Sequence, residues 1–538
     1  MPIARSWSRC FLPLALSLCP LLRAAEAPGT PAQAAGPVAA PKPVAGPGFR
    51  ITTGKPYNLF ADGEPVTFKI TAVEAGRSLA LTVFDADGQA LGSITVASTA
   101  GSIETGISPQ GKRYLAVVIA DPREPAKPLA QLSLAVLPPA PPPDRRFGLS
   151  VRPDFSGLVR RLGGYWLRSP LSREQEQPGK LSAGNGIEQT VATIRAGGCE
   201  VVGSANHPLP EASVPAADAN GAGHDVLAAA DLAAWDAYLA DTARRIRGTV
   251  PVFEIWNEAG SAQFPRSTPA TFAQRVADCA VLLKRGSATL RKEAPGLLIG
   301  AGVMADTPGS TASEFLRALL QKGCADAIDF VSVHYGRATT GPERLPADQA
   351  GSDSDLDGCL RRLADVQREF RIAKAVWLTE IGSPTAEPGG ADAAGESEQA
   401  ASLVRSHVIG LANGVAVVLW SELDGTGCAV YREERGPKPA MPAYIQLTRA
   451  LEGRSFSRRV PDSTVRVYEF RAGKKDSVLV AWALEPPPPG ALKTWSLPAG
   501  YELVRAENLF GEKLELTADA PLPLSSSPVY LFCRQRPP

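Results

Sequence analysis

The sequence is poor in the residues that build metal centres. It has four histidines and eight cysteines in 538 residues, and no two cysteines form a CxxC pair. Structural zinc and iron–sulfur sites need such closely spaced ligands, so we expect no metal and no cofactor. Six cysteines lie beyond the N-terminal segment and are scattered singly, which favours buried thiols. If the protein is exported, one or two disulfides are possible, but the sequence does not specify which cysteines would pair.

An excess of charge of either sign is also lacking. The 56 basic and 55 acidic residues leave a net charge of +1, which gives no electrostatic attraction to nucleic acid or to an anionic membrane surface. Beyond the N-terminus, no uninterrupted apolar run approaches the roughly 18 residues of a membrane-spanning helix. We therefore expect no nucleic-acid partner and no membrane insertion, and the oligomeric state stays open.

The N-terminus has the residue order of a secretory signal. Arg5 and Arg9 precede an apolar run at 11–22, and small residues follow it. This order predicts a signal peptide over residues 1–27 and hence a secreted or periplasmic protein. Residues 28–48 are rich in Pro, Ala and Gly with almost no charge, which predicts a flexible linker.

Three blocks of regular pattern follow. Short alternating runs separated by turns predict a β-sandwich over 49–137, and a proline-rich stretch at 138–146 predicts a stiff linker. Buried apolar strands alternate with amphipathic helices over 147–453. Eight such units in about 300 residues is the count and length of a (β/α)8 TIM barrel, with a doubly wound open sheet as the alternative. Alternation at period two returns over 454–538 and predicts a C-terminal β-domain.

The ends of the expected barrel strands are the natural place to search for chemistry, because active sites of such barrels lie at the C-terminal ends of the strands. The strands are expected at 147–151, 165–168, 200–204, 252–257, 297–302, 330–334, 375–379 and 415–420. Polar or aromatic residues stand at six of these ends, namely Arg168, Asn206 with His207, Asn257 with Glu258, His334 with Tyr335, Glu380, and Trp420.

Two of these residues are glutamates on the fourth and seventh strands. Glu258 and Glu380 are three strand–helix units apart, which places them nearly across the barrel mouth from each other. Two carboxyl groups about 5–5.5 Å apart can cleave a glycosidic bond with retention, one as nucleophile and the other as acid and then base. For either glutamate alone, a strand-end salt bridge is the alternative. Glu254 is expected as a buried ion-pair partner inside the barrel and not as a third catalytic group.

The stretches at 253–258 (FEIWNE) and 377–382 (WLTEIG) resemble clan A of the glycoside hydrolases. The pattern is most similar to family 39 and related families, which include β-xylosidases, α-L-iduronidases and exopolysaccharide hydrolases. The resemblance covers the barrel and implies a retaining enzyme with Glu258 as acid/base and Glu380 as nucleophile. Many family members have proline after the acid/base, where this chain has Ala259 and Gly260, so the loop on the leaving-group side differs.

The same resemblance implies supporting roles for the other strand-end residues. It places Asn257 at the sugar 2-hydroxyl, Arg168 and Tyr335 beside the nucleophile, Trp420 as a sugar-stacking platform, His207 and His334 at substrate hydroxyls, and Asn206 next to His207. A guanidinium beside Glu380 is expected to keep that carboxylate ionised. The negative charge of Glu380 is in turn expected to keep Glu258 protonated.

Two weaker motifs point to other functions. The stretch at 300–305 (GAGVMA) fits a loose dinucleotide fingerprint but lacks the acidic residue that should follow it. The stretch at 353–358 (DSDLDG) begins like a calcium loop. Its twelfth position is Ala364, where a bidentate carboxylate is needed, so an acidic helix start is the better interpretation.

Together these patterns predict an exported, modular, retaining glycosidase that cleaves the O-glycosidic bonds of a poly- or oligosaccharide by double displacement. Two alternatives remain: a non-catalytic carbohydrate-binding protein on the same fold, and a transglycosylase that uses the same residues. The sugar, the linkage and the choice between endo and exo action depend on loops whose conformation the sequence does not predict.

Overall fold

The computed structural model describes residues 44–46 and 49–535, apart from shorter segments within that range. These segments are 73–75, 98–100, 126, 172–185, 206–228, 260–270, 306–310, 337–341, 344–354, 386–392, 422–426, 434, 474–475, 485–492 and 517–520. The predicted signal peptide and most of the predicted linker therefore lie outside the described residues.

The first part of the chain forms two β-sheets that share one hydrophobic cluster. One sheet has the order β1-β2-β4-β7 and the other β3-β9-β8-β5-β6. Side chains from both sheets, such as Ile70 and Leu81, belong to the cluster between them. Its strands are β1 (Val44–Gly46), β2 (Phe49–Thr52), β3 (Leu59–Ala61), β4 (Val66–Ala72), β5 (Ser78–Phe84), β6 (Ala90–Ala97), β7 (Ser102–Ile107), β8 (Tyr114–Ala120) and β9 (Pro128–Leu137).

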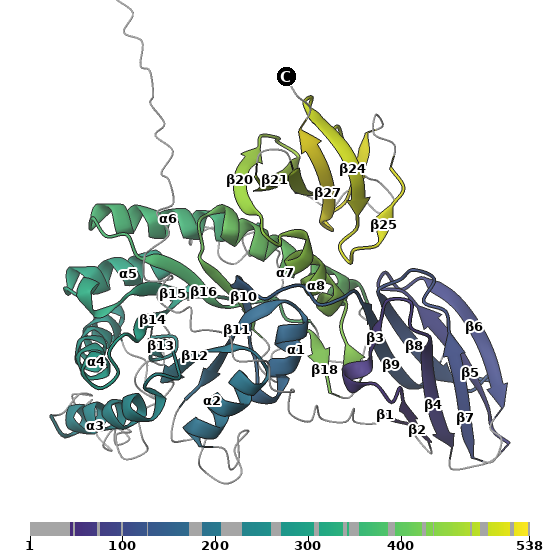
Figure 1. The fold of residues 1–538 in the computed structure, drawn as a ribbon, viewed down its shortest axis with the longest axis horizontal. Helices are drawn as coiled ribbons and strands as arrows, with labels where there is room; N and C mark the ends of the chain where they lie inside the picture. Colours follow the sequence, from purple (N-terminus) through teal and green to yellow (C-terminus); the bar gives the residue numbers. More distant parts are fainter. Residues whose placement is uncertain are drawn as a thin grey trace, which may run out of the picture. The chain divides into compact units, whose positions relative to one another are not determined.

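The middle of the chain forms a closed barrel of eight parallel strands (Figure 1). Each strand pairs with the next along the chain, and β10 pairs with β17, where Ser150 lies opposite Ser421 and closes the ring. Closure overturns the doubly wound alternative, because an open sheet has two unpaired edges. The strands are β10 (Asp144–Ser150), β11 (Gly164–Pro170), β12 (Glu200–Ala205), β13 (Val252–Ile255), β14 (Leu298–Ala305), β15 (Phe330–Gly336), β16 (Ala375–Gly382) and β17 (Val417–Ser421).

Helices follow the barrel strands, and Figure 1 shows α2 to α6 outside the strands. Local sequence fixes where several of them begin. Thr271 and Thr311 each open a helix with a reciprocal capping box, which satisfies backbone N–H groups of the first turn. Asp355 caps α6 by accepting a hydrogen bond from the Gly358 amide. The helices are α1 (Ser156–Arg161), α2 (Ile187–Ala196), α3 (Ala229–Ile246), α4 (Phe272–Glu293), α5 (Ala312–Gln321), α6 (Leu356–Glu369), α7 (Ala393–Ala412) and α8 (Ala440–Ala450).

The last part of the chain is again β-structure. A six-stranded sheet has the order β20-β21-β22-β27-β24-β25, and β23 pairs with β26. Alternate residues of β21 divide between two clusters: Val467 belongs to a cluster within this part, and Tyr468 to the main hydrophobic cluster of the barrel. The strands are β20 (Ser455–Val460), β21 (Val465–Ala472), β22 (Asp476–Ala483), β23 (Lys493–Trp495), β24 (Tyr501–Glu507), β25 (Lys513–Leu514), β26 (Leu522–Leu524) and β27 (Val529–Gln535), with the short pair β18 (Tyr431–Arg432) and β19 (Gly436–Pro437) before them.

The structure confirms the predicted fold class, a TIM barrel with additional β-sheets on both sides of it in the sequence. The weak dinucleotide motif is part of strand β14, and the weak calcium motif leads into a capped helix start. All six cysteines in the described part of the chain are buried free thiols. None of the helices that the structure describes is long and apolar enough to cross a membrane.

Candidate active site

The C-terminal ends of four barrel strands bring the expected polar side chains together. Arg168 lies near the end of β11, Asn257 and Glu258 follow β13, His334 lies near the end of β15, and Glu380 near the end of β16. Hydrogen bonds and ion pairs join all five side chains into one group. Residues separated by more than 200 positions in the sequence thus meet at one end of the barrel, as the strand-end pattern predicts.

The turn that carries Glu258 has an unusual backbone. Trp256 has a φ of 70° and Glu258 a φ of 51°, in the left-handed region that residues other than glycine rarely occupy. Each such residue costs about 1–3 kcal/mol, and the surrounding structure must hold it in place. The Trp256 ring does so by packing on Trp235, with ring centroids 5.6 Å apart, and Ala259 is buried directly after the turn. The chain therefore leaves strand β13 in a fixed, strained conformation.

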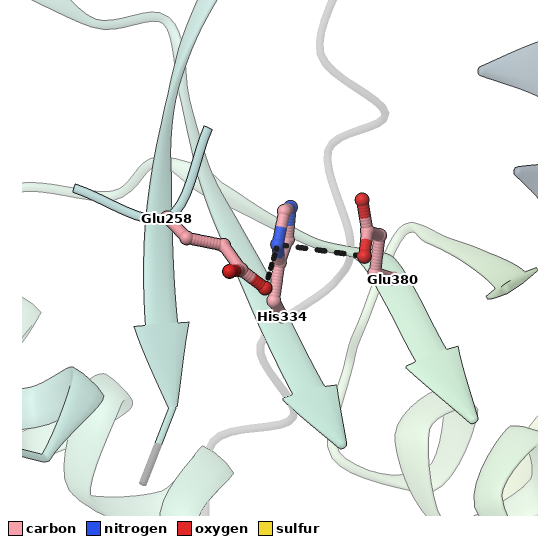
Figure 2. A group of neighbouring side chains, drawn as sticks. All are labelled: Glu258, His334 and Glu380. Carbon is pink, nitrogen blue, oxygen red and sulfur yellow. Dashed lines mark hydrogen bonds and ion pairs between the residues drawn. The ribbon is translucent and has the colours of Figure 1, made fainter. Parts of the chain in front are cut away.

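The two glutamates lie close together with an imidazole between them. One carboxylate oxygen of Glu258 and one of Glu380 lie within 4.8 Å of each other. Figure 2 shows the His334 ring between them; its Nδ1 is 3.4 Å from Glu258 Oε1 and 3.8 Å from Glu380 Oε2. The His334 side chain is buried, whereas 33% of the Glu258 side chain and 13% of the Glu380 side chain are exposed. Both carboxylates are thus partly exposed, and the histidine between them is buried.

Arg168 hydrogen-bonds both Glu380, the candidate nucleophile, and Asn257. Its Nε donates to Glu254 Oε2 at 2.5 Å, and one terminal nitrogen donates to Asn257 Oδ1 at 2.8 Å. The other terminal nitrogen donates to Glu380. The predicted guanidinium beside Glu380 is therefore present. The prediction that Glu254 is a buried ion-pair partner is also confirmed, because Glu254 is fully buried against Arg168.

The charges around Glu258 contradict one expectation. A hydrogen bond with His334 lowers the pKa of Glu258, against burial, which raises it. For His334, burial lowers the pKa, but Glu380 and the bond to Glu258 outweigh it, so the pKa is raised above its ordinary value. This direction contradicts the expectation that the negative charge of Glu380 would raise the pKa of Glu258 and keep it protonated. The reason is that the imidazole lies between the two carboxylates and is hydrogen-bonded to Glu258.

Other predicted site residues have different surroundings. Trp420 is fully buried; its Nε1 donates to the Cys428 carbonyl at 2.8 Å and its ring stacks on His407. This position does not fit a sugar-stacking platform, because the indole face contacts protein. Tyr335 is buried in the main hydrophobic cluster, and its expected place beside Glu380 stays a prediction. His207 and Asn206 lie outside the described residues.

Two residues of the site were missed by the sequence analysis. Ser332 donates a hydrogen bond to Glu254, and its hydroxyl lies 2.6 Å from that of Thr379. The available signal was a hydroxyl residue inside the apolar strand 330–334, where a polar side chain needs a buried partner. For Thr379 the sequence offered no such signal, because the orientation of its side chain depends on an irregularity in the pairing of β15 with β16.

The same region is the place where a metal ion would have suitable ligands. Glu258, His334 and Glu380 each offer one ligand atom, and these atoms lie within 4.8 Å of one another. Paired carboxylates cleave glycosidic bonds without a metal, so the residues present account for such chemistry by themselves.

Comparison with solved structures shows which fold this is. A family 39 glycoside hydrolase from the gut symbiont Bacteroides cellulosilyticus WH2 matches with a TM-score of 0.65 and 19% sequence identity, over 88% of this chain and 98% of that one. This chain has the fold of a family 39 glycoside hydrolase. At that identity the likeness shows a shared fold, and the activity must be argued from the site.

Two further structures match more weakly. A glucosidase from Croceicoccus marinus has a TM-score of 0.49 at 12% identity, over 74% of this chain and 98% of that one. A GH39 enzyme from Xanthomonas axonopodis pv. citri has a TM-score of 0.45 at 16% identity, over 74% and 96%. No protein-family model matches the sequence, and no curated protein sequence matches it.

Proposed function

We propose that this protein is a retaining glycoside hydrolase, with Glu258 as acid/base and Glu380 as nucleophile. One observation carries the proposal: an oxygen of each carboxylate lies within 4.8 Å of the other. Retaining glycosidases place their carboxyl groups about 5–5.5 Å apart, whereas inverting enzymes separate them by about 6.5–9.5 Å to admit a water molecule. The short separation favours a double displacement.

The surroundings of the two glutamates support this division of roles. Arg168 donates a hydrogen bond to Glu380, which holds in place the carboxylate that would attack the anomeric carbon. Glu258 is the more exposed of the two, as suits a group that must reach the leaving oxygen and later a water molecule. Asn257, held by Arg168, would then hydrogen-bond the sugar 2-hydroxyl, an interaction that strengthens in the transition state.

The reaction would proceed in two balanced steps. In the first, a Glu380 oxygen bonds to the anomeric carbon while the glycosidic C–O bond breaks and Glu258 gives its proton to the departing oxygen. In the second, Glu258 takes a proton from water, the water oxygen bonds to the anomeric carbon, and the Glu380 ester bond breaks. Glu258 regains the proton that it gave up and Glu380 is again ionised, so both carboxylates return to the forms in which the first step begins.

The substrate and the location belong to the same proposal. We propose a poly- or oligosaccharide substrate, which suits a site at the open end of a barrel. Export to the periplasm or the medium is proposed from the signal-like residues 1–27. Cell fractionation, with mass spectrometry of the mature N-terminus, tests export; intact residues 1–27 on a cytoplasmic protein would contradict it.

Separate replacement of the two glutamates by alanine tests the mechanism. Glu258→Ala with an activated aryl glycoside and azide should yield a glycosyl azide of retained configuration, because the nucleophile still forms the intermediate. Glu380→Ala should yield the inverted azide, because azide attacks directly. Glu515→Ala removes an exposed carboxylate and should behave as the parent.

Three results would contradict the proposal. They are a parent protein inactive on a broad panel of glycosides, products of inverted configuration from the parent, and full activity in both alanine variants. Oligosaccharide binding without turnover would favour the carbohydrate-binding alternative.

A further inference from the structure

A ring of polar side chains lies beneath the two catalytic carboxylates. It runs from Arg168 to Glu254, then to Ser332 and Thr379, and returns through the backbone to Glu380, which Arg168 also contacts. Glu254, Ser332 and Thr379 are fully buried and Arg168 is 3% exposed. Burying charged groups costs free energy, which pairing and hydrogen bonds offset only in part. A ring of this kind is therefore maintained at a cost in stability.

The hydrogens of the ring can be assigned from chemistry alone. An ionised carboxylate only accepts hydrogen bonds, and a hydroxyl has one hydrogen to give. Ser332 therefore donates to Glu254, and Thr379 must donate to Ser332 across their 2.6 Å contact. Burial raises the pKa of Glu254, but Arg168, His334 and the Ser332 bond outweigh it and lower that pKa below its usual value. Both Glu254 oxygens are thus occupied, and the carboxylate is held in one orientation.

Strand register explains how neighbouring residues both enter the ring. The pairing of β15 with β16 passes from Val333 opposite Leu378 to His334 opposite Glu380, so that Thr379 is an extra residue in the register. Side chains of a regular strand alternate between its two faces, whereas an irregularity of this kind re-aims a side chain. Here the Thr379 hydroxyl reaches Ser332 while the Glu380 carboxylate reaches Arg168. The nucleophile candidate and the ring are therefore built by the same irregularity.

We propose that Glu254, oriented by Ser332 and Thr379, is a positioning residue that fixes Arg168 and thereby Glu380 and Asn257. Glu254 holds Arg168 by its Nε, and a guanidinium is planar, so this one bond sets where both terminal nitrogens point. One of them meets the nucleophile and the other meets the amide that would contact the sugar. Glu254 touches neither group itself. The inference rests on the proposed function for its catalytic consequence, but the positioning of Arg168 does not require turnover.

Two substitutions separate the geometry of Glu254 from its charge. Glu254→Ala removes the hold on Arg168 and should lower kcat on the order of 100-fold, the effect of a displaced catalytic group, with little change in KM for an activated substrate. Glu254→Gln can keep the geometry, because the amide oxygen accepts from Arg168 and the amide nitrogen donates to a reoriented Ser332. Most of kcat should then return.

The glutamine variant should still move the pH profile. Loss of the Glu254 charge leaves the Arg168 charge less compensated, which makes the surroundings of the two catalytic carboxylates more positive. The acid limb of kcat/KM is expected to move to lower pH by about one unit. A purely structural role would lower the amount of active protein and leave this limb where it was.

A buried glutamate elsewhere provides a matched control. Glu469 in β21 is also fully buried and accepts hydrogen bonds from Arg471, Arg458 and Ser477. Glu469→Gln is the same chemical change beside two arginines, in a strand that follows the barrel in the sequence. It should leave the acid limb unmoved.

The tests distinguish failure of this inference from failure of the proposed function. An inactive parent on all glycosides overturns the function, and a crystal structure of Glu254→Ala still decides the positioning. It should show the Arg168 guanidinium turned away from Asn257. Unchanged contacts of Arg168 with Glu380 and Asn257 in that structure would overturn the inference. If Glu254→Ala does not fold, an acid limb shared by Glu254→Gln and the parent overturns it instead.

Discussion

Replacing His334 by asparagine should make Glu258 hold its proton to a higher pH. The bond with His334 is the largest influence on the pKa of Glu258, and it lowers that pKa. Removing the imidazole removes the bond and the positive charge together. The pKa of Glu258 then rises, and the basic limb of kcat/KM, which reports loss of the acid proton, moves to higher pH.

The size of the shift follows from the contact. Nδ1 lies 3.4 Å from Glu258 Oε1, and unit charges about 4 Å apart attract by about 4 kcal/mol at an effective dielectric constant of ~20. Because 33% of the Glu258 side chain is exposed, water screens much of that energy. We expect a movement of roughly one pH unit, equivalent to about 1.4 kcal/mol.

The assay is kcat/KM for an aryl glycoside across the pH range, for the parent and for His334→Asn, with thermal melts to establish that both are folded. The limb is assigned to the coupled group of two carboxylates and one imidazole, and not to Glu258 alone. A basic limb that stays in place, or that moves to lower pH, would refute the reasoning that His334 controls the proton on Glu258.

Three further outcomes are expected. Extended treatment with a chelator should leave the glycosidase activity unchanged; loss of activity that returns with a divalent cation would show that the Glu258, His334 and Glu380 group holds a metal. Thr271→Ala, which removes the capping box of α4, should lower the free energy of unfolding by about 1 kcal/mol in denaturant titrations, and an unchanged value would contradict the cap. The buried thiols, of which Cys199 has its pKa raised to about 12 by burial, should react with a thiol reagent only after unfolding; rapid labelling of the native protein would contradict their burial.

Much of the barrel was predictable because its strands are short apolar runs, six of which end on a polar or aromatic residue. The expected strand at 252–257 corresponds to Val252–Ile255, and the one at 415–420 to Val417–Ser421. The count of eight units favoured a closed barrel, and the pairing of β10 with β17 decided against an open sheet. The meeting of Glu258 with Glu380 was predictable for the same reason, since the C-terminal ends of parallel barrel strands share one face.

The remainder depended on information that residue patterns do not contain. The extra residue Thr379 in the register has no sequence signal, and it decides which side chains of β16 point toward Ser332 and Arg168. Trp420 was placed by its strand end alone, whereas its burial depends on Cys428 and His407 packing around it. The direction of the Glu258 pKa shift depended on His334 lying between two carboxylates, a three-dimensional fact.

The left-handed residues after β13 have a consequence for engineering this protein. Glu258 holds a conformation that glycine adopts without penalty, so a laboratory selection for heat resistance alone would favour glycine at this position. At 256 the same selection should keep the tryptophan, because glycine there would remove a buried ring that packs on Trp235 and cost more than the strain it releases. A library enriched only for thermal stability should therefore accumulate folded, robust and catalytically poor variants at this turn, and a useful screen must select for turnover at the same time.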